Sequence, residues 1–228
     1  LAGKHIYVQA EQGFGDSIQF ARYLPLLAAR AGQVTLRVHQ QIVTLLRESL
    51  PGVTVLGDRG DPAPYQCDAV LLSLPRLFKT RLETIPAAVP YLRAPADVAQ
   101  RWKARLGKME GLKVGVVWAG NPDHVNDSRR SVSLSMLEPL FAVRGAAFAS
   151  LQFGPRAADL KKLKKGKAKH AIDDLSPWFG DYVETAGAVS ALDLVITVDT
   201  SVAHLAGALG KPVWVPLPWV TDWRWLLG

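Results

Sequence analysis

Apolar residues follow two alternating patterns along the 228-residue chain. Short runs rich in valine, isoleucine and leucine predict buried strands at residues 6–9, 34–38, 53–56, 68–72, 113–118, 147–151, 194–198 and 213–215. Longer segments, with apolar residues recurring every three or four positions, predict helices at residues 17–31, 42–50, 96–106, 134–141, 182–191 and 202–209. Strands that alternate with helices are typical of an α/β fold in which helices cover parallel sheets.

This pattern stops and restarts once, near the middle of the chain. Gly107 and Gly111 lie between a predicted helix and the next predicted strand, which indicates a hinge between two βαβ halves. Within the first half, Pro25 lies inside a helical pattern and is expected to kink it, because proline has no backbone N–H to donate. Residues 57–65 are rich in glycine, proline and aspartate and predict a surface loop.

The net charge of the chain indicates which classes of ligand it could bind. The formal net charge of +7 suits an anionic ligand, whether a nucleotide diphosphate, a nucleic acid or an acidic membrane surface. The lysines of residues 161–169 have no aromatic residue among them, so a solvated helix end and loop are favoured over a nucleic-acid site.

The single cysteine, Cys67, excludes an internal disulfide and fits a reducing, cytoplasmic compartment. The longest apolar run, residues 189–206, is interrupted by two aspartates, so no membrane span is predicted.

The two ends of the chain are unusual for a complete protein. The sequence begins with Leu1 rather than methionine, and it stops at Gly228 just as another helical pattern begins. We therefore expect the chain to be a piece of a longer protein.

A glycine-containing turn at residues 9–16 joins the first predicted strand to the first predicted helix. Gly13 and Gly15 allow the backbone to approach a ligand closely, and the first amides of the helix would face that ligand. The turn does not complete a dinucleotide fingerprint, because Ile18 takes the place of the third glycine and no acidic residue follows the second strand. A nicotinamide-dependent dehydrogenase is therefore disfavoured.

Asp16, directly after the second of these glycines, has two interpretations. As an N-cap, its carboxylate would accept hydrogen bonds from helix amides and need no further role. As a functional group, it would be held ionised by the helix N-terminus and would accept a proton from an acceptor hydroxyl. One carboxylate can serve in both ways, so the sequence leaves both open.

A second polar turn follows the strand predicted at residues 194–198. Asp199, Thr200 and Ser201 end this strand, and His204 lies one turn into the next helix. Hydroxyls and helix amides can hold a phosphate here, because ligands of open α/β sheets gather at the carboxyl ends of strands. The structural alternative makes Asp199 and Ser201 helix caps and His204 a half-buried histidine with satisfied hydrogen bonds. The four residues together favour the phosphate site.

The loop after the strand at residues 113–118 leaves the second half at the same edge. It contains Asn121 and then Arg130, whose guanidinium could neutralise a departing diphosphate by bidentate contact. The alternative is a solvated loop. Near the end of the chain, core or interdomain packing is expected, with sugar stacking or membrane contact as lesser alternatives, for the tryptophans at 214, 219, 223 and 225.

Motifs of several other enzyme classes are missing from the sequence. The chain contains no His-Glu-x-x-His or Cys-x-x-Cys metal motif, no Gly-x-Ser-x-Gly nucleophile elbow and no Walker loop. It also contains no Asp-x-Asp triplet, so nothing suggests a diphosphate held by a metal ion. We expect neither a metal nor a cofactor.

The two polar turns together resemble a known family. Residues 13–16, Gly-Phe-Gly-Asp, combined with residues 199–212, Asp-Thr-Ser-Val-Ala-His-Leu-Ala-Gly-Ala-Leu-Gly-Lys-Pro, are similar to glycosyltransferase family 9, the heptosyltransferase-like group. The resemblance covers nearly the whole chain. It is strongest to the transferase region behind tetratricopeptide repeats in bacterial proteins, which continues into a segment like residues 222–228.

This resemblance implies an α/β fold of the GT-B type, with two Rossmann-like domains whose parallel sheets face each other across a cleft. Residues 1–107 would form the acceptor-side domain, and residues 108–228 a donor-binding domain truncated at its C-terminus. A nucleoside-diphosphate sugar would be the donor, and a glycan, a lipid-linked molecule or a protein would be the acceptor. Transfer would be metal-independent and would invert the anomeric centre, in a cytoplasmic protein whose peripheral contact with the inner membrane stays open.

The resemblance also assigns roles to individual residues. Asp16 matches the catalytic base, while Asp199, Thr200, Ser201 and His204 match donor-binding positions and Arg130 matches a basic residue near the diphosphate. Residues of the other two turns complete the predicted donor site, namely Gly13, Gly15 and Asn121.

Two positions depart from the family pattern, and they keep other functions open. Phe153 stands where related sequences carry lysine, and Ser128 where they carry arginine, so two positive charges near the donor are lost. A non-catalytic module that binds a nucleotide sugar or a carbohydrate for an attached repeat array is the main alternative. A sugar-nucleotide epimerase of the same fold, which would convert the donor without an acceptor, is the weaker one.

Overall fold

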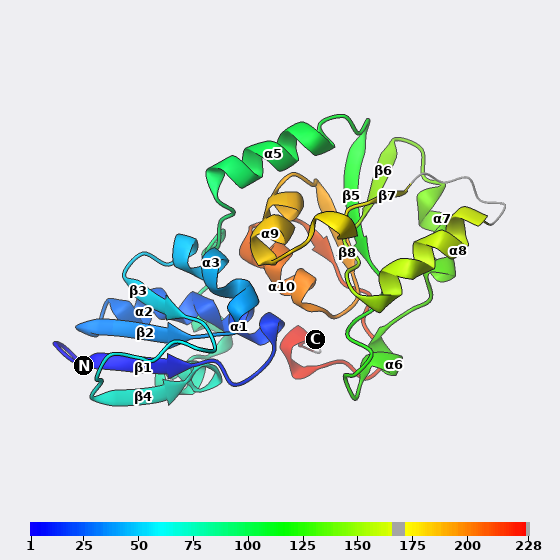
Figure 1. The fold of residues 1–228 in the computed structure, drawn as a ribbon. Helices are drawn as coiled ribbons and strands as arrows, with labels where there is room; N and C mark the ends of the chain where they lie inside the picture. The colour runs from blue at the N-terminus through cyan, green and yellow to red at the C-terminus, as the bar shows by residue number, and fades with distance from the viewer. Residues whose placement is uncertain (166–171, 227–228) are drawn as a thin grey trace.

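A computed structural model describes residues 1–165 and 172–226 of the chain, and it contains two parallel sheets in two lobes (Figure 1). The first sheet has the order β3-β2-β1-β4. Its strands are β1 (His5–Gln9), β2 (Gln33–Arg37), β3 (Val53–Leu56) and β4 (Cys67–Val70). The second sheet has the order β7-β6-β5-β8-β9. Its strands are β5 (Leu112–Val117), β6 (Ala146–Ser150), β7 (Ile172–Asp174), β8 (Leu194–Thr197) and β9 (Val213–Trp214). The predicted α/β fold with parallel sheets is confirmed.

Three long helices follow the sequence pattern closely, because each buries one apolar face. They are α3 (Gln40–Ser49), α5 (Ala96–Leu106) and α9 (Tyr182–Ser190). The helix predicted at residues 17–31 is broken instead into α1 (Phe14–Phe20), a 3-10 turn (Ala21–Tyr23) and α2 (Leu24–Ala28). Pro25 lies in the first turn of α2, where its missing N–H costs nothing, so the kink expected there is confirmed as a break.

Other helical segments are shorter than predicted or were missed. Residues 134–141 form a 3-10 turn (Leu134–Leu137) and then α7 (Glu138–Phe141), since Pro139 can only be accommodated in a first turn. The sequence pattern missed β7 and two short helices, α4 (Leu74–Leu77) and α6 (Asp127–Arg130). The solvated helix end expected among the lysines is the end of α8 (Asp159–Lys165), where Lys161 and Lys162 are exposed. Of the lysines in residues 161–169, those at 167 and 169 lie outside the described residues.

Helix α5 precedes the predicted hinge, yet it packs against α9 of the second lobe (Figure 1). The indole of Trp102 is buried there, and its Nε1 donates a 2.7 Å hydrogen bond to Glu184. Gly187 makes this packing possible, since a Cβ on it would lie 2.4 Å from Trp102 Cδ1. The division of the chain at residue 107 stays a prediction.

The two lobes also meet at the centre of the molecule, where α1 packs against α10 (Ser201–Ala208) (Figure 1). The linker before α5 is fixed to the end of α10, because the amides of Tyr91 and Leu92 both donate to the Ala208 carbonyl at 2.9 and 3.1 Å. Helix α1 begins after β1 and α10 begins after β8. Their packing therefore brings the carboxyl ends of the two sheets together.

In the described part of the chain, none of the helices has both the length and the apolarity needed to cross a membrane.

Candidate functional site

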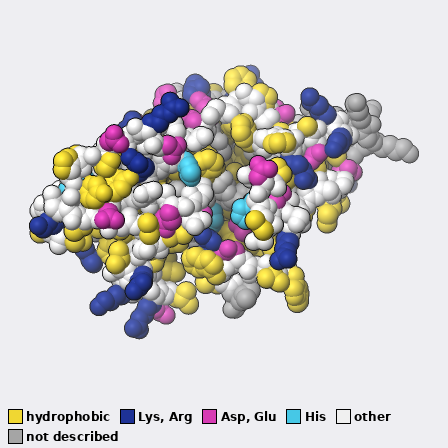
Figure 2. Space-filling model, turned by 60° about the horizontal axis from the view of Figure 1, so that its bottom comes forward, with side chains coloured by type: hydrophobic (Ala, Val, Ile, Leu, Met, Phe, Trp, Pro, Cys, Tyr) yellow, Lys and Arg dark blue, Asp and Glu magenta, His cyan; other side chains and the backbone are white. Residues whose placement is uncertain are grey.

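A cavity of about 970 Å³ lies between the lobes, where Figure 2 shows a hollow with histidine and acidic side chains at its rim. Its wall is built from the β1–α1 turn, the loop after β5, the β8–α10 turn and the segment after β9. Every residue predicted for the site lies on this wall, namely Gly13, Gly15, Asp16, Asn121, Arg130, Asp199, Thr200, Ser201 and His204. The structure thus brings together residues that are up to 191 positions apart in the sequence, from 13 to 204.

The β1–α1 turn differs in detail from the sequence interpretation. The N-cap of α1 is Gly13, with φ −69° and ψ −178°, so this glycine has an extended backbone that any residue could adopt. Asp16 lies in the first turn of the helix, and its interpretation as the N-cap is wrong. Gly15 is required for packing: a Cβ there would lie 2.9 Å from His204 Cδ2 and 3.4 Å from Ser201 Cα. The close approach at Gly15 is therefore between the two lobes.

The β8–α10 turn is held by side-chain hydroxyls. Thr200 is the N-cap of α10, and its Oγ1 accepts a 3.3 Å hydrogen bond from the amide of Val202. The structural alternative, in which Asp199 and Ser201 cap this helix, is wrong. The Ser201 hydroxyl instead lies 2.6 Å from the Tyr182 hydroxyl, and burial raises the pKa of Tyr182 to about 12. These contacts fix the turn whose amides and hydroxyls face the cavity.

His204 lies at the boundary between the lobes, beneath Gly15. Burial lowers the pKa of this histidine below its ordinary value of 6.5, and the nearby carboxylate of Asp199 opposes that shift. The imidazole is stacked on Trp225, with the ring centroids 5.4 Å apart. At neutral pH it is therefore a neutral hydrogen-bonding group in the cavity wall, and the positive charge of the site must come from arginines.

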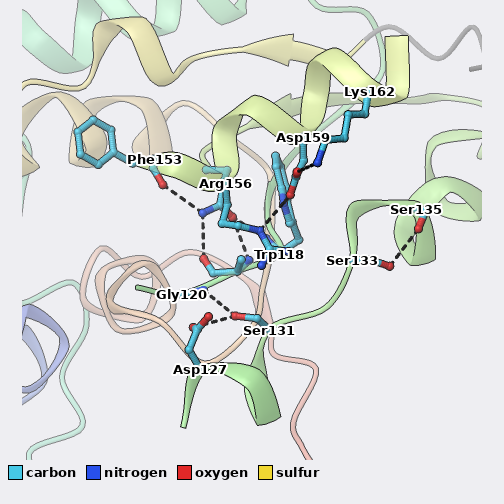
Figure 3. Close-up of polar contacts among 12 residues, drawn as sticks. Trp118, Gly120, Asp127, Ser131, Ser133, Ser135, Phe153, Arg156, Asp159 and Lys162 are labelled. Carbon is cyan, nitrogen blue, oxygen red and sulfur yellow. Dashed lines mark hydrogen bonds and ion pairs between the residues drawn. The ribbon is translucent and has the colours of Figure 1, made fainter. Parts of the chain in front are cut away.

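Arg130 on α6 supplies one such charge, and it is firmly positioned. Its Nη1 donates a 2.9 Å hydrogen bond to the Asp199 carbonyl, and its Nε lies 3.5 Å from Asp127 Oδ1. Asp127 is buried and accepts a 2.8 Å hydrogen bond from Ser131, which in turn accepts one from the Gly120 amide at 2.9 Å (Figure 3). This chain of contacts ties the loop after β5 to the β8–α10 turn.

Gly120 leaves room for that arginine. A Cβ on Gly120 would lie 2.5 Å from Arg130 Nη2 and 2.6 Å from Asp127 Oδ1. Asn121 next to it is exposed, and its side chain accepts a 3.2 Å hydrogen bond from the Asp123 amide. Asn121 thus shapes the loop and borders the cavity without contacting the other predicted residues.

Gln152, after β6, is a site residue that the sequence interpretation missed. It is 2% exposed, and its Oε1 accepts from the amides of Trp118 and Ala119 at 3.1 and 2.9 Å. Its Nε2 donates to the carbonyls of Ala119 and Phe153 at 2.9 and 3.2 Å, so one side chain joins the ends of β5 and β6. Figure 3 shows this region, with Trp118 beside Arg156 and Asp159. The sequence feature that could have identified Gln152 is its position directly after an apolar strand, where a polar side chain can bind the ends of neighbouring strands.

The two positions that depart from the family pattern have different surroundings. Phe153 lies on the cavity wall and is 65% exposed, so an apolar ring borders the site there. Ser128 is exposed on α6 and is not part of the described cavity wall.

The segment after β9 also forms part of the wall, through Pro218, Val220, Thr221, Asp222 and Arg224. Packing was expected for the four tryptophans on and around it, and the structure confirms this for two of them. Trp225 is stacked on His204, and the ring centroid of Trp223 lies 6.4 Å from that of Phe20 in the first lobe. The expectation is wrong for Trp219 and Trp214, which are 99% and 64% exposed. No motif in the sequence indicated that this segment reaches Asp16, 208 residues away.

No protein-family model matches the chain. Protein FlbA of Caulobacter vibrioides is 29% identical over 240 residues, which cover 94% of this chain and 39% of FlbA. The chain thus spans about two fifths of the length of that relative.

Three solved structures resemble the whole arrangement. A family 9 glycosyl transferase from Veillonella parvula has a TM-score of 0.69 at 13% identity, covering 94% of this chain and 81% of that one. The Escherichia coli heptosyltransferase WaaC with ADP-2-deoxy-2-fluoro heptose has a TM-score of 0.64 at 12% identity, with 96% and 90% covered. The E. coli iron-containing dodecameric glycosyltransferase TibC has a TM-score of 0.64 at 14% identity, with 94% and 58% covered. The chain has the GT-B fold of these enzymes.

The iron in the description of TibC raises the question of a metal in this GT-B chain. Among residues 1–165 and 172–226, no group of three or more histidine, cysteine, aspartate or glutamate side chains is placed to hold a metal ion. Cys67 is exposed on β4, in the first lobe.

Proposed function

We propose that this protein is a glycosyltransferase that moves a sugar from a nucleoside-diphosphate sugar to an acceptor hydroxyl. One observation carries the proposal: the cavity between the two sheets has a carboxylate, Asp16, on one lobe, and Arg130 with the start of α10 on the other. A displacement at an anomeric carbon needs a base for the acceptor and positive charge for the leaving diphosphate. The wall offers both across a space large enough for a nucleotide sugar.

The proposed step inverts the anomeric centre and needs no metal. The acceptor oxygen forms a bond to the anomeric carbon while the bond from that carbon to the diphosphate oxygen breaks. The bonding electrons leave with the diphosphate, and the acceptor proton passes to the carboxylate of Asp16. Arg130 and the amides at the start of α10 balance the charge that develops on the diphosphate.

The structural neighbours support the class of donor. WaaC has been solved with an ADP-heptose analogue and with ADP, and a plant neighbour of the same arrangement, Arabidopsis thaliana FUT1, with GDP. A nucleoside diphosphate sugar is therefore the donor class that we propose here. The repeat array, the acceptor and the membrane contact expected from the sequence remain predictions.

The test combines donor binding with transfer. Thermal shift is measured with a panel of nucleoside-diphosphate sugars, and the donor that stabilises the protein is then used in transfer and donor-hydrolysis assays. We expect Asp16→Asn to keep the fold by circular dichroism and to lose turnover by about two orders of magnitude or more. Glu11→Gln is the matched control, because it removes an exposed carboxylate from the same β1–α1 turn. Wild-type turnover in Asp16→Asn would show that the base is assigned wrongly.

A non-catalytic nucleotide-sugar-binding module is a second candidate, and one contact favours it. One oxygen of the Asp16 carboxylate, Oδ1, is bound to the guanidinium of Arg224, so this oxygen is not available to an acceptor hydroxyl in this arrangement. This candidate predicts that a donor stabilises the protein while no transfer or hydrolysis occurs with any acceptor tested. The same assays therefore decide between the two functions.

A further inference from the structure

The segment after β9 places an arginine between two carboxylates in the cavity wall. Arg224 belongs to a 3-10 turn (Trp223–Trp225), and its Nη2 pairs with Asp16 Oδ1 across the lobes. Its Nη1 donates a 2.8 Å hydrogen bond to Asp222 Oδ1. The Arg224 side chain is 16% and that of Asp16 20% exposed, so the pair is poorly screened by solvent. Arg224 therefore holds the very group that the proposed reaction needs as a base.

The described wall carries more carboxylates than guanidinium groups, which disfavours the binding of an anionic donor as long as Arg224 stays paired with Asp16. The wall carries four carboxylates, Asp16, Asp181, Asp199 and Asp222. It carries three guanidinium groups, on Arg129, Arg130 and Arg224. With His204 neutral, the formal charge of these groups is −1. A diphosphate adds further negative charge, so it needs a cation that can turn from a carboxylate toward it.

Arg224 has an unused donor for this purpose. Within the described part of the chain, its Nε is buried without a hydrogen-bond partner, and so are Thr221 Oγ1 and Trp225 Nε1 of the same segment. Buried donors in native structures nearly always have a partner, and Thr221 and Arg224 both line the cavity, so their unpaired groups point to a ligand there. The Nε and Nη2 groups share one edge of the guanidinium, and that edge fits the two oxygens of a phosphate. Release of Asp16 would open it.

Arg130 is less suited to such an exchange. Its Nη1 is bound to the Asp199 carbonyl, within the second lobe. Its Nε, which like that of Arg224 has no hydrogen-bond partner in the described part of the chain, lies 3.5 Å from the buried carboxylate of Asp127, also in the second lobe. Arg224 is bound instead to a carboxylate of the opposite lobe and belongs to a segment with little regular structure. The two arginines thus differ in what holds them, and Arg224 is the one whose partner the donor can replace.

We propose that Arg224 is a donor-binding residue that exchanges Asp16 for the diphosphate. The exchange has two effects, since it brings a bidentate cation to the leaving group and frees the Asp16 carboxylate to accept the acceptor proton. This inference rests on the proposed function, because it assumes a diphosphate donor in the cavity.

A double-mutant cycle on nucleoside-diphosphate affinity tests the exchange. Calorimetry with ADP, GDP, UDP and CDP first identifies the diphosphate that the wild-type protein binds, and its affinity is then measured for each variant. We expect Arg224→Gln to weaken binding about tenfold or more and Arg224→Lys to weaken it less, since lysine keeps the charge but not the bidentate edge. Asp16→Asn is expected to tighten binding severalfold, because Arg224 no longer has to leave a carboxylate.

The energetic coupling between Asp16 and Arg224 distinguishes the proposed exchange from simple charge repulsion. In the double variant, Asp16→Asn with Arg224→Gln, the gain from Asp16→Asn should vanish, whereas simple repulsion between Asp16 and the anion would leave it intact. Arg101→Gln is the control, because it breaks another arginine–carboxylate pair, with Glu184 at 2.8 Å, outside the cavity wall. Thermal melts check that each variant is folded.

Each outcome has a distinct meaning. If the wild type binds a diphosphate and Arg224→Gln binds it equally well, the exchange is refuted and the proposed function stands. If the Asp16→Asn gain persists in the Arg224→Gln background, the exchange is again refuted. If the wild type binds none of the diphosphates, the proposed function fails and this inference fails with it.

Discussion

The imidazole of His204 lies flat against the indole of Trp225, with 5.4 Å between the ring centroids and 13° between the ring planes. His204 comes from α10, and Trp225 comes from the segment that also carries Arg224. This stack and the Arg224–Asp16 ion pair are thus two contacts by which one short segment covers the junction between the lobes. The stack also contributes to the burial that lowers the pKa of His204.

Removal of the indole should therefore raise the pKa of His204 toward its ordinary value. Trp225→Ala exposes the imidazole to water, and the desolvation that penalises its charged form is reduced. Histidine resonances followed by NMR through a pH titration measure this, with His204→Gln to assign the signal. Trp178→Ala is the matched control, since that indole contacts Arg105, 4.2 Å from its ring centroid, rather than a histidine. An unchanged His204 titration in Trp225→Ala would mean that other neighbours cause the shift.

The same lowered pKa predicts how stability depends on pH. Between the folded-state pKa of His204 and 6.5, the unfolded chain binds more protons than the folded one, so the free energy of unfolding rises with pH in that window. The contribution of the neutral His204 imidazole to the free energy of unfolding is complete above pH 6.5, and it is lost as the pH falls through the folded-state pKa. Urea unfolding at several pH values should show a shallower dependence for His204→Gln than for the wild type, and an equal dependence would contradict it.

Gly15 should be intolerant of even one added methyl group. Alanine favours helices over glycine by up to about 1 kcal/mol, but its Cβ would lie 2.9 Å from His204 Cδ2, and the imidazole is held by Trp225. We expect Gly15→Ala to destabilise the protein by about 1–3 kcal/mol in denaturant unfolding, as overpacked sites do.

Gly13→Ala is the natural comparison, because the Cβ added there meets only Asp16 Oδ2, at 3.7 Å. Its φ of −69° suits alanine, but alanine is a poorer N-cap than glycine, so the change should cost about 0.5 kcal/mol, less than Gly15→Ala. Equal losses in the two variants would mean that the contact between α1 and α10 does not require Gly15.

The sequence was sufficient for the α/β fold because most of the strands and the longer helices carry their own local signal. The apolar strands β1, β2 and β8 are buried on both faces, and Pro25 and the glycines mark where helices break or lobes join. The residues that follow β1 and β8 were predicted to meet, because ligands of α/β sheets bind at the carboxyl ends of strands and the family resemblance implies two sheets that face each other across a cleft. All of the predicted site residues accordingly lie on one cavity wall, although their roles stay predictions.

What the sequence could not supply were contacts that depend on tertiary position. Nothing local to Arg224 indicates that it meets Asp16, and nothing local to Gln152 indicates four hydrogen bonds to strand ends. The caps were misassigned for a related reason: Asp16 and Thr200 both belong to polar turns, and only the backbone conformation decides which residue becomes the N-cap.

The buried hydrogen bonds of Gln152 should be needed for the stability of the second lobe. Gln152→Leu keeps a similar volume but leaves the buried amides of Trp118 and Ala119 without partners, at a cost of about 1–3 kcal/mol or more. Gln100→Leu makes the same chemical change at an exposed position of α5 and should be nearly neutral. Denaturant unfolding of both variants measures the difference, and a similar stability for the two would refute the role.

A lysine at position 153 should improve the binding of the diphosphate. Phe153 is 65% exposed on the cavity wall, so the longer side chain fits without repacking and its ammonium can reach the anion. The effect of one such solvent-exposed charge is roughly 0.5–1 kcal/mol, which corresponds to about two- to fivefold tighter binding. Added salt should weaken the gain, since the charge is screened over about 10 Å at 0.1 M. Val143→Lys adds the same charge at a position 53% exposed and away from the described wall, and an equal gain there would show only a general effect of net charge.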